Sequence, residues 1–432
     1  MKSAAILLLL GFIGLAQGGE LDWGQWRGPL GTGESSTADP PKAWSETENV
    51  LWKTPIPGVG HASPIVWGDR VYLTTAVPFG KSRLPVFDNA PGSHDNLPVT
   101  KSHRFVVLAV DRANGKIVWD TTVNEAFPHH GGHKSGTLAS NSPVTDGQVI
   151  IAFFGSHGLH GLDPNGKVLW KKDLGKMETK HAHGEGASPV LHGNTVVVNW
   201  DHEGESLIYA FDKQTGVEKW KVARDEKTSW ATPIVVAHKE TIQVIVSATK
   251  RIRSYDLETG TLIWECGGLS NNVVASPVAT NGIVIAGSSY EKKAMVAIKL
   301  DGATADITDT DQVLWKTNQR TPYVPSPLLY DNTLYFLNHY QGILSCLHSA
   351  TGEKRAGPFR LGALSNIYAS PVAAAGRLYL TDLDGATMVL EHGDTPKPIG
   401  VNQLDESISA SAALSGKDLF LRGEKHLYAI RD

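Results

Sequence analysis

One short motif recurs along almost the whole chain and constrains its fold more than any other feature. A residue that is usually small, then Ser or Thr, then Pro occurs in seven places, and an eighth copy keeps the serine but has lost the proline. Successive copies are 41 to 50 residues apart, except for a first interval of 79. A period of this length indicates a repeat architecture. The copies are Ala62-Ser63-Pro64, Asn141-Ser142-Pro143, Ala187-Ser188-Pro189, Ala231-Thr232-Pro233, Ala275-Ser276-Pro277, Pro325-Ser326-Pro327, Ala369-Ser370-Pro371 and Ala410-Ser411-Ala412.

Each copy of the motif is followed by the same order of strand and turn signals. A turn with Gly, Asn or Asp comes first, and a run of β-branched or aromatic residues follows it. A third strand then ends in Asp, and a Gly turn leads into a fourth strand that ends in Trp, as at Asp212, Gly216 and Trp220. Four short antiparallel strands per repeat predict the blade of a β-propeller.

The two ends of the chain predict how the ring closes. The eighth repeat stops after its third strand, at Asp432, whereas Val50-Leu51-Trp52-Lys53 matches a fourth strand with its Trp. We therefore expect an all-β, eight-bladed propeller over residues 49–432, with four antiparallel strands per blade and the last blade closed by an N-terminal strand. The long first interval predicts an insertion at 78–103 in blade 1, which is either a cap over the channel or a disordered loop.

The N-terminal residues indicate a targeting signal. Lys2 precedes an apolar run over 4–16, and Ala16-Gln17-Gly18 supplies the small residues of a cleavage site. This pattern predicts a signal peptide at 1–18, a leader segment at 19–48, and export to the periplasm or the cell exterior. Later parts of the chain contain no apolar run of membrane-spanning length, so we do not expect a membrane span.

Composition narrows the classes of partner and of chemistry. A net charge of −4 gives no reason to expect nucleic acid as a partner. Cys266 and Cys346 are the only cysteines, and we expect two separate thiols in a monomeric protein. The sequence has no Gly-x-Ser-x-Gly nucleophile motif, no phosphate-binding loop and no Cys-x-x-Cys-His haem motif.

The repeat resembles that of a known family. Ala-Ser-Pro followed by Asp-x-x-Thr-Gly-x-x-x-Trp is similar to the pyrroloquinoline-quinone (PQQ)-like repeat, and the resemblance covers residues 50–432. The leader Trp23-Gly24-Gln25-Trp26-Arg27-Gly28-Pro29 looks like the opening segment of exported PQQ-like repeat proteins of environmental bacteria. The resemblance implies a propeller, which in different proteins serves as an enzyme, a scaffold or a binding module.

Two branches of that family imply different functions. Quinoprotein alcohol dehydrogenases hold PQQ and Ca²⁺ over the channel with Glu, Asn and a catalytic Asp, and here Glu185 and Asn271 or Asn272 occupy comparable positions. The next blade, however, begins Thr321-Pro322-Tyr323 without an Asp, and no adjacent Cys pair is present. The other branch is the scaffold propeller of outer-membrane protein assembly, a lipoprotein whose lipid-bearing Cys this chain lacks.

Histidines mark the candidate site. Nine of the 17 His fall between residues 129 and 202, in loops that, by analogy with other propellers, open on one face. Three interpretations stay open: solvated polar loops, a pocket for a small molecule or glycan, and a Zn²⁺ or Cu²⁺ site formed by His183, Glu185 and His202. The candidate ligand-binding residues at the channel mouth are His129, His133, His181, His183, Glu185, His202, Trp230, Asn271 and Asn272.

These observations favour a binding or scaffold protein over an enzyme. We expect a binding or scaffold protein that receives a protein or a small molecule at its channel face, without a cofactor. The alternative is a periplasmic oxidoreductase that depends on a metal or a quinone, the latter with PQQ and Ca²⁺.

Overall fold

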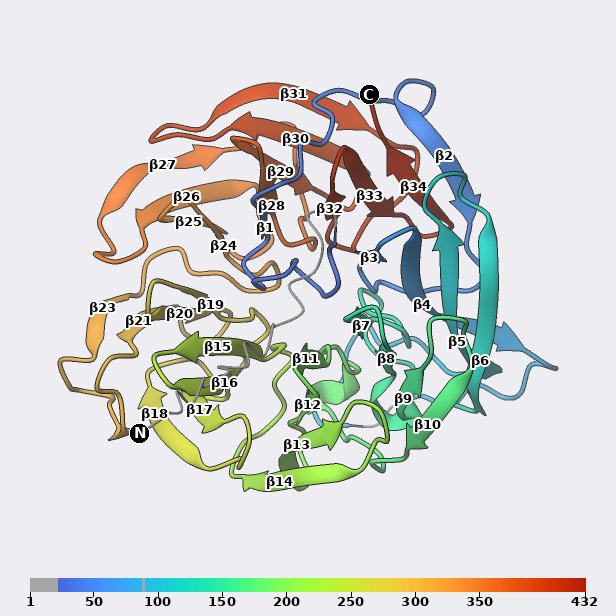
Figure 1. Cartoon of the computed structure of the whole chain (residues 1–432), viewed down its shortest axis with the longest axis horizontal. Helices are drawn as coiled ribbons and strands as arrows, with labels where there is room; N and C mark the ends of the chain where they lie inside the picture. The colour runs from blue at the N-terminus through green and yellow to red at the C-terminus, as the bar shows by residue number, and fades with distance from the viewer. Residues whose placement is uncertain (1–21, 88–89) are drawn as a thin grey trace, which may run out of the picture.

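Eight antiparallel sheets follow one another around a central channel (Figure 1). The structure is a computed structural model that describes residues 22–87 and 90–432. It confirms the predicted all-β, eight-bladed propeller. Two 3-10 turns, η1 (Gly155–His157) and η2 (Lys180–Ala182), are its helical elements among these residues, and none of the described helices is long and apolar enough to cross a membrane.

Each blade contains four antiparallel strands that pair in chain order from the channel outward, except that the outer strand of blade 8 comes from the N-terminus. The strands of blades 1 and 2 are β3 (Ile65–Trp67), β4 (Arg70–Phe79), β5 (Ser102–Asp111), β6 (Ile117–Ala126), β7 (Val144–Thr145), β8 (Ile150–Phe153), β9 (Leu159–Leu162) and β10 (Val168–Lys172). Those of blades 3 and 4 are β11 (Val190–His192), β12 (Thr195–Trp200), β13 (Ser206–Asp212), β14 (Glu218–Arg224), β15 (Ile234–His238), β16 (Thr241–Ala248), β17 (Arg251–Asp256) and β18 (Leu262–Gly267).

The remaining blades repeat this order. The strands of blades 5 and 6 are β19 (Val278–Thr280), β20 (Ile283–Ser288), β21 (Ala294–Lys299), β23 (Val313–Thr317), β24 (Leu328–Tyr330), β25 (Thr333–Leu337), β26 (Ile343–His348) and β27 (Lys354–Arg360). Those of blades 7 and 8 are β28 (Val372–Ala374), β29 (Arg377–Thr381), β30 (Ala386–Glu391), β31 (Lys397–Gln403), β32 (Ala413–Ser415), β33 (Asp418–Arg422), β34 (His426–Ile430) and, from the N-terminus, β2 (Val50–Pro55).

The N-terminal strand closes the ring as predicted. Strand β2 pairs antiparallel with β34, with Trp52 opposite Ala429 and Thr54 opposite Leu427. Because β34 would otherwise be an open sheet edge, this pairing supplies the missing fourth strand of blade 8.

The repeated Ser or Thr holds the blades in a closed circle of hydrogen bonds. In each motif the backbone N–H donates to the hydroxyl of the motif in the next blade, at 2.8–3.0 Å, and the eighth motif donates to the first. All eight side chains are buried, so each bond pairs a backbone group that water cannot reach. The residues of this hydroxyl ring are Ser63, Ser142, Ser188, Thr232, Ser276, Ser326, Ser370 and Ser411.

The outer Trp residues dock five of the eight blades on the next. Five indole N–H groups donate at 2.9–3.0 Å to backbone carbonyls in the Gly-containing turn that precedes the fourth strand of the following blade. A Cβ atom on the Gly of that turn would lie 2.6–2.7 Å from the indole, so only Gly permits the contact. Trp264 is buried as well but donates to Gln243 of its own sheet. The five docked side chains are Trp52, Trp119, Trp170, Trp220 and Trp315.

Two blades carry a fifth strand that the repeat did not predict. Strand β22 (Ala305–Asp306) lies between β21 and β23 in the chain and returns to pair with the outer edge of β18. Strand β1 (Glu34–Ser35) pairs with the inner edge of β28. Both additions are parallel two-residue contacts that cover a sheet edge.

The leader crosses one end of the channel. It pairs with blade 1 through Trp23 and Val66, contacts blade 6 through the bond from Leu329 N–H to the Thr32 carbonyl, and joins blade 7 through β1. Figure 1 shows this blue segment over the centre of the ring. The signal peptide predicted at 1–18 lies outside the described residues, and the boundary predicted at residue 48 stays a prediction.

The two cysteines form no disulfide bond with each other. Cys266 and Cys346 are buried free thiols, and burial raises their pKa values to about 11 and about 12, so both stay protonated at neutral pH.

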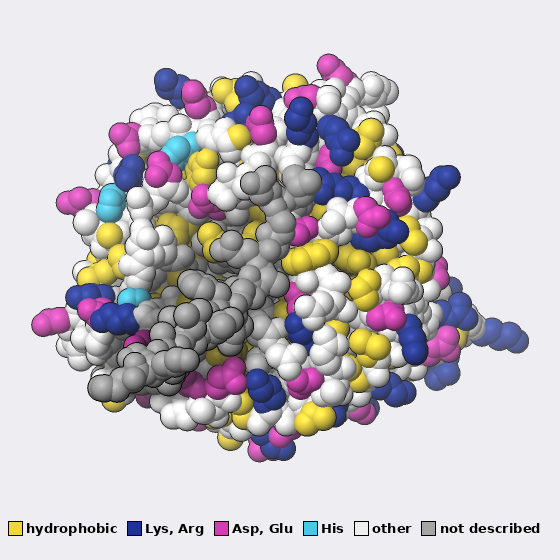
Figure 2. Space-filling view, viewed as in Figure 1, with side chains coloured by type: hydrophobic (Ala, Val, Ile, Leu, Met, Phe, Trp, Pro, Cys, Tyr) yellow, Lys and Arg dark blue, Asp and Glu magenta, His cyan; other side chains and the backbone are white. Residues whose placement is uncertain are grey.

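On the face drawn in Figure 2, outside the grey atoms, Lys and Arg alternate with Asp and Glu around the rim. This face therefore lacks the extended basic surface that nucleic-acid binding requires.

Candidate functional site

A hollow opens at the end of the channel where the Ser/Thr-Pro motifs begin the innermost strands. It contains about 1520 Å³ of empty space, a volume that includes open solvent. Its wall includes members of the hydroxyl ring and side chains from the loops above them. We call this hollow the mouth.

One side of the mouth is formed by four histidines. His133 precedes blade 2, His181 and His183 precede blade 3, and His94 comes from the insertion between β4 and β5. The His183 ring centroid lies 4.6 Å from that of His94, 4.8 Å from that of His133 and 5.3 Å from that of His181. Ligand atoms of His94, His133 and His183 all lie within 4.8 Å of one another.

The opposite side of the mouth is formed by four tyrosines from the loops of blades 5 to 7. Tyr290 stacks on Tyr323 at a centroid distance of 5.4 Å, and Tyr340 stacks on Tyr368 at 5.6 Å. Tyr323 also hydrogen-bonds Asn272, and burial raises its pKa to about 12. These rings therefore present neutral aromatic surface to the hollow.

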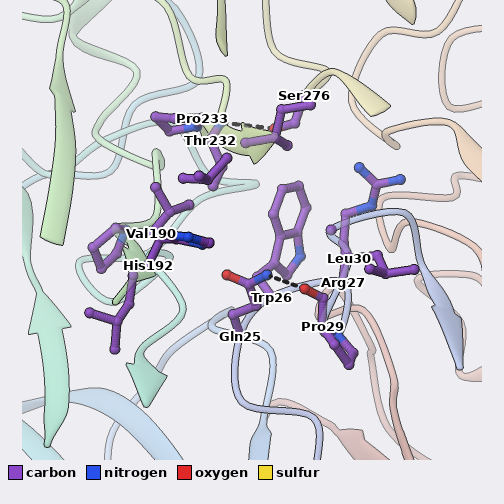
Figure 3. Close-up of a pocket in the computed structure, with 15 residues that line it drawn as sticks. Gln25, Trp26, Arg27, Pro29, Leu30, Val190, His192, Thr232, Pro233 and Ser276 are labelled. Carbon is purple, nitrogen blue, oxygen red and sulfur yellow. Dashed lines mark hydrogen bonds between the residues drawn. The ribbon is translucent and has the colours of Figure 1, made fainter. Parts of the chain in front are cut away.

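Trp26 of the leader forms the floor. It lines the mouth and also the hollow on the leader side of the channel, so it separates the two. In Figure 3 its indole stands between Val190 and Leu30, with Thr232 and Ser276 beyond it. The adjacent Arg27 is buried and donates to the carbonyls of Thr32 and Pro327, which fixes this part of the leader in the channel.

Glu185 is the carboxylate of the mouth, and its surroundings make it a weak acid. The Ser156 backbone N–H donates to its Oε2 at 2.6 Å, and the Ser156 hydroxyl donates to its Oε1. Burial raises the pKa of Glu185 to about 7, although these hydrogen bonds oppose the shift. The same hydroxyl accepts from the Met177 N–H at 2.8 Å, so the carboxylate is held in a fixed network.

The structure does not bring His183, Glu185 and His202 together as a ligand set. Both ring nitrogens of His202 are already bonded, Nδ1 to the Glu178 N–H and Nε2 to the Glu205 carbonyl. Glu185 is held by Ser156, as described above. Among residues 22–87 and 90–432, His183 is grouped with other histidines, His94 and His133.

The other predicted residues divide between the mouth and its surroundings. Trp230 and Asn272 line the mouth, and the Trp230 N–H donates to the Gly184 carbonyl at 2.7 Å. Asn271 instead bonds Glu291. His129 lies in a smaller neighbouring hollow, where its Nε2 is bonded to the Met177 carbonyl at 3.0 Å.

Sequence reasoning missed His94, the tyrosines and Trp26. His94 lies in a segment without either strand or helix periodicity, so nothing local placed it over the mouth. Each Tyr occurs once in a loop whose length varies between repeats. The Tyr290 and Tyr323 positions nevertheless could have been found, because they follow β20 and precede blade 6, as the histidine loops do in blades 2 and 3.

Comparison with protein families shows which family the chain belongs to. The sequence model of the family described as "Outer membrane protein assembly factor BamB" matches residues 103–357, which is more than half of the chain. The chain belongs to this PQQ-like repeat family. No curated protein matches the sequence.

Solved structures of PQQ-like propellers share its fold. BamB from Moraxella catarrhalis is 15% identical with a TM-score of 0.55, and the match covers 83% of this chain and 99% of that one. A europium-containing methanol dehydrogenase is 12% identical, with a TM-score of 0.62 and coverage of 95% and 91%. Quinohemoprotein alcohol dehydrogenase from Comamonas testosteroni is 10% identical, with a TM-score of 0.60 and coverage of 95% and 80%. These identities support a common fold and nothing finer.

The residues of this mouth do not fit PQQ with Ca²⁺. PQQ carries three carboxylates, yet the described residues that line the mouth include no Lys or Arg. Glu185, which would have to bind the ion, is bonded to Ser156 at both oxygens. Asn272 does line the mouth, but the described residues that line it include no Asp.

Proposed function

We propose that this PQQ-like propeller is a binding protein whose mouth takes a neutral polyhydroxylated molecule, a glycan in the first instance. The observation that carries the proposal is the composition of the wall, which combines aromatic rings with uncharged hydrogen-bonding groups. The C–H faces of sugars pack on aromatic rings, while their hydroxyls both donate and accept hydrogen bonds.

The polar groups suit such a ligand. Ser, Thr and Asn side chains and neutral imidazoles can donate or accept, as sugar hydroxyls require. His183 stays neutral at physiological pH because burial and the neighbouring histidines lower its pKa to about 4. A charged ligand would meet no counter-ion on this wall except Glu185, so an uncharged one is favoured.

A glycan array tests the proposal. The parent protein should bind a restricted set of oligosaccharides, and Tyr323→Ala should weaken that binding at least about tenfold because a stacking ring is lost. Tyr330→Ala is the matched control, since Tyr330 belongs to blade 6 but does not line the mouth. No glycan binding, or binding that Tyr323→Ala leaves unchanged, would contradict the proposal and favour a scaffold that uses another surface.

We also infer that the protein is exported. The apolar run over residues 4–16 and the small residues before Gly19 support removal of residues 1–18. The leader and the propeller over 49–432 would then fold as one unit, because buried Arg27 of the leader bonds the Pro327 carbonyl of the propeller. Intact mass of the protein from its native compartment should correspond to a chain that begins near Gly19; a mass that includes Met1 would contradict export by this signal.

A further inference from the structure

The histidine side of the mouth has features that sugar binding does not use. Three ligand atoms, one each from His94, His133 and His183, lie within 4.8 Å of one another. Zn–N bonds of about 2.0–2.1 Å in a tetrahedral site place ligand nitrogens roughly 3.3 Å apart. Small side-chain rotations therefore suffice to bring the three nitrogens around one ion.

Hydrogen bonds already select the tautomer that a metal requires in His94 and His181, whereas Nδ1 of His133 accepts from the Ser135 N–H at 3.2 Å. Nδ1 of His94 lies 2.9 Å from the Gly92 carbonyl, and Nδ1 of His181 lies 2.7 Å from the Pro91 carbonyl. A carbonyl only accepts, so both Nδ1 atoms carry the proton and both Nε2 atoms keep a free lone pair. Metal-bound histidines characteristically donate their second N–H to a carbonyl or carboxylate in this way.

His183 supplies an independent observation. Its Nε2 is buried and has no hydrogen-bond partner within the described part of the chain. A buried polar atom without a partner is destabilising unless something binds it. This nitrogen belongs to the same three-histidine group, so one ion would satisfy it.

The backbone around His181 is held in an unusual conformation. His181 and Ala182 have φ values of 55° and 50°, which non-glycine residues adopt rarely. The Asn96 side chain donates to both of their carbonyls, at 2.9 and 3.2 Å, and so ties the insertion to η2. Strained backbone that neighbouring contacts hold in place is typical of ligand sites.

We propose that His94, His133 and His183, with the His181 ring adjacent to that of His183, bind one divalent transition-metal ion at the rim of the mouth. Imidazoles without thiolates favour Zn²⁺ or Cu²⁺ over Mg²⁺ or Ca²⁺. The Asp95 carboxylate, 4.0 Å from His133 Nε2, contributes negative charge nearby. The ion fastens the insertion to the loops before blades 2 and 3. The site uses His183, which the glycan proposal counts among its polar groups, but the stacking surface of that proposal lies on the tyrosine side.

Titration of the chelator-stripped protein with ZnCl₂, followed by calorimetry, tests the proposal. The parent should bind one equivalent, and His94→Ala and His183→Ala should each lower the affinity at least about tenfold. His94 is exposed, so that variant is expected to fold. His130→Ala is the matched control, because His130 lies in the other described histidine-containing group, with His129 and Glu178, and should leave the affinity unchanged.

A second readout separates binding at this site from binding elsewhere. Zn²⁺ should raise the melting temperature of the parent and of His130→Ala, but not that of His94→Ala. Absence of binding in the parent, unchanged affinity in both His94→Ala and His183→Ala, or loss of binding in His130→Ala would each overturn the proposal.

Discussion

Glu185 is a residue whose ionisation depends strongly on where the fold has placed it. Burial raises its pKa from 4.5 to about 7, so between these pH values the folded state holds a proton that the unfolded state has released. Stability from this group is therefore complete below about pH 4.5 and is lost as the pH rises toward 7. Buried histidines such as His157, whose pKa is lowered to about 4, act with the opposite sign.

Replacement of Glu185 isolates its contribution. Glu185→Gln cannot titrate, so its free energy of unfolding relative to the parent should increase between pH 4.5 and 7, by up to about 3 kcal/mol, and then level off. Altered hydrogen bonds to Ser156 shift the free energy of unfolding of Glu185→Gln by the same amount at every pH, so they do not change this pH dependence. Urea unfolding at several pH values measures the difference. Parallel pH profiles for the two proteins would contradict the assigned environment.

Gly216 tests the contact between blades at a single residue. A Cβ there would lie 2.6 Å from the Trp170 ring, whereas a Cβ on Gly193, in the same blade and also at positive φ, would meet no atom within 4 Å. Gly193→Ala should cost about 1–2 kcal/mol from backbone strain alone. Gly216→Ala should cost about 1–3 kcal/mol more because the indole must move. Equal losses in denaturant unfolding would show that the docking contact is unimportant.

For single residues, the sequence predicted which kinds of side chain the site contains better than it predicted what those side chains contact. His133, His181, His183, Glu185, Trp230 and Asn272 were selected by their positions before the innermost strands, and all six line the mouth. His129 precedes blade 2 and His202 lies between β12 and β13, but backbone groups bond Nε2 of His129 and both ring nitrogens of His202. Whether a loop side chain faces a cavity or a neighbouring carbonyl depends on loop conformation, which a repeat period does not specify.

Among the structural elements, the hydroxyl ring explains why every repeat carries a Ser or Thr at the same position. Ser188 accepts from the Ser142 N–H and donates its own N–H to Thr232, both at 2.9 Å. Loss of one hydroxyl leaves a buried N–H without a partner and breaks a circle that joins all eight blades.

Ser188→Ala should lower the free energy of unfolding by about 1–3 kcal/mol. Ser188→Thr is the matched control, because Thr232 fills the same position in the next blade, and it should keep most of the stability. Denaturant unfolding followed by Trp fluorescence compares the three proteins. If Ala and Thr variants lose the same amount, the hydroxyl is not the stabilising group.

The strands themselves were predictable because each blade repeats the same signals, and the closing strand was predictable because one blade lacked its fourth strand. Strands β1 and β22 were not, since two residues give no alternation and parallel pairing depends on where the chain returns. The path of the leader across the channel depends on the buried residues Arg27 and Trp23. The leader lies outside the repeats, so the repeat period could not predict this path.

For the whole molecule, the residues of the mouth distinguish this protein from the dehydrogenases whose fold it shares. Addition of PQQ and Ca²⁺ should not produce dye-linked oxidation of primary alcohols, because the mouth offers no cation among its described residues for the quinone carboxylates and Glu185 is engaged by Ser156. Turnover in the parent that disappears in Glu185→Gln would contradict this prediction and establish a quinoprotein.

The central claim is that the mouth, between its histidine and tyrosine sides, is where this propeller binds its ligand. A crystal structure of the protein with the tightest-binding oligosaccharide from the array tests it most directly. We predict a sugar ring packed against Tyr323, with hydroxyls bonded to polar groups of the mouth and Trp26 beneath. An oligosaccharide bound instead on an outer strand or on the leader side of the channel would contradict the claim.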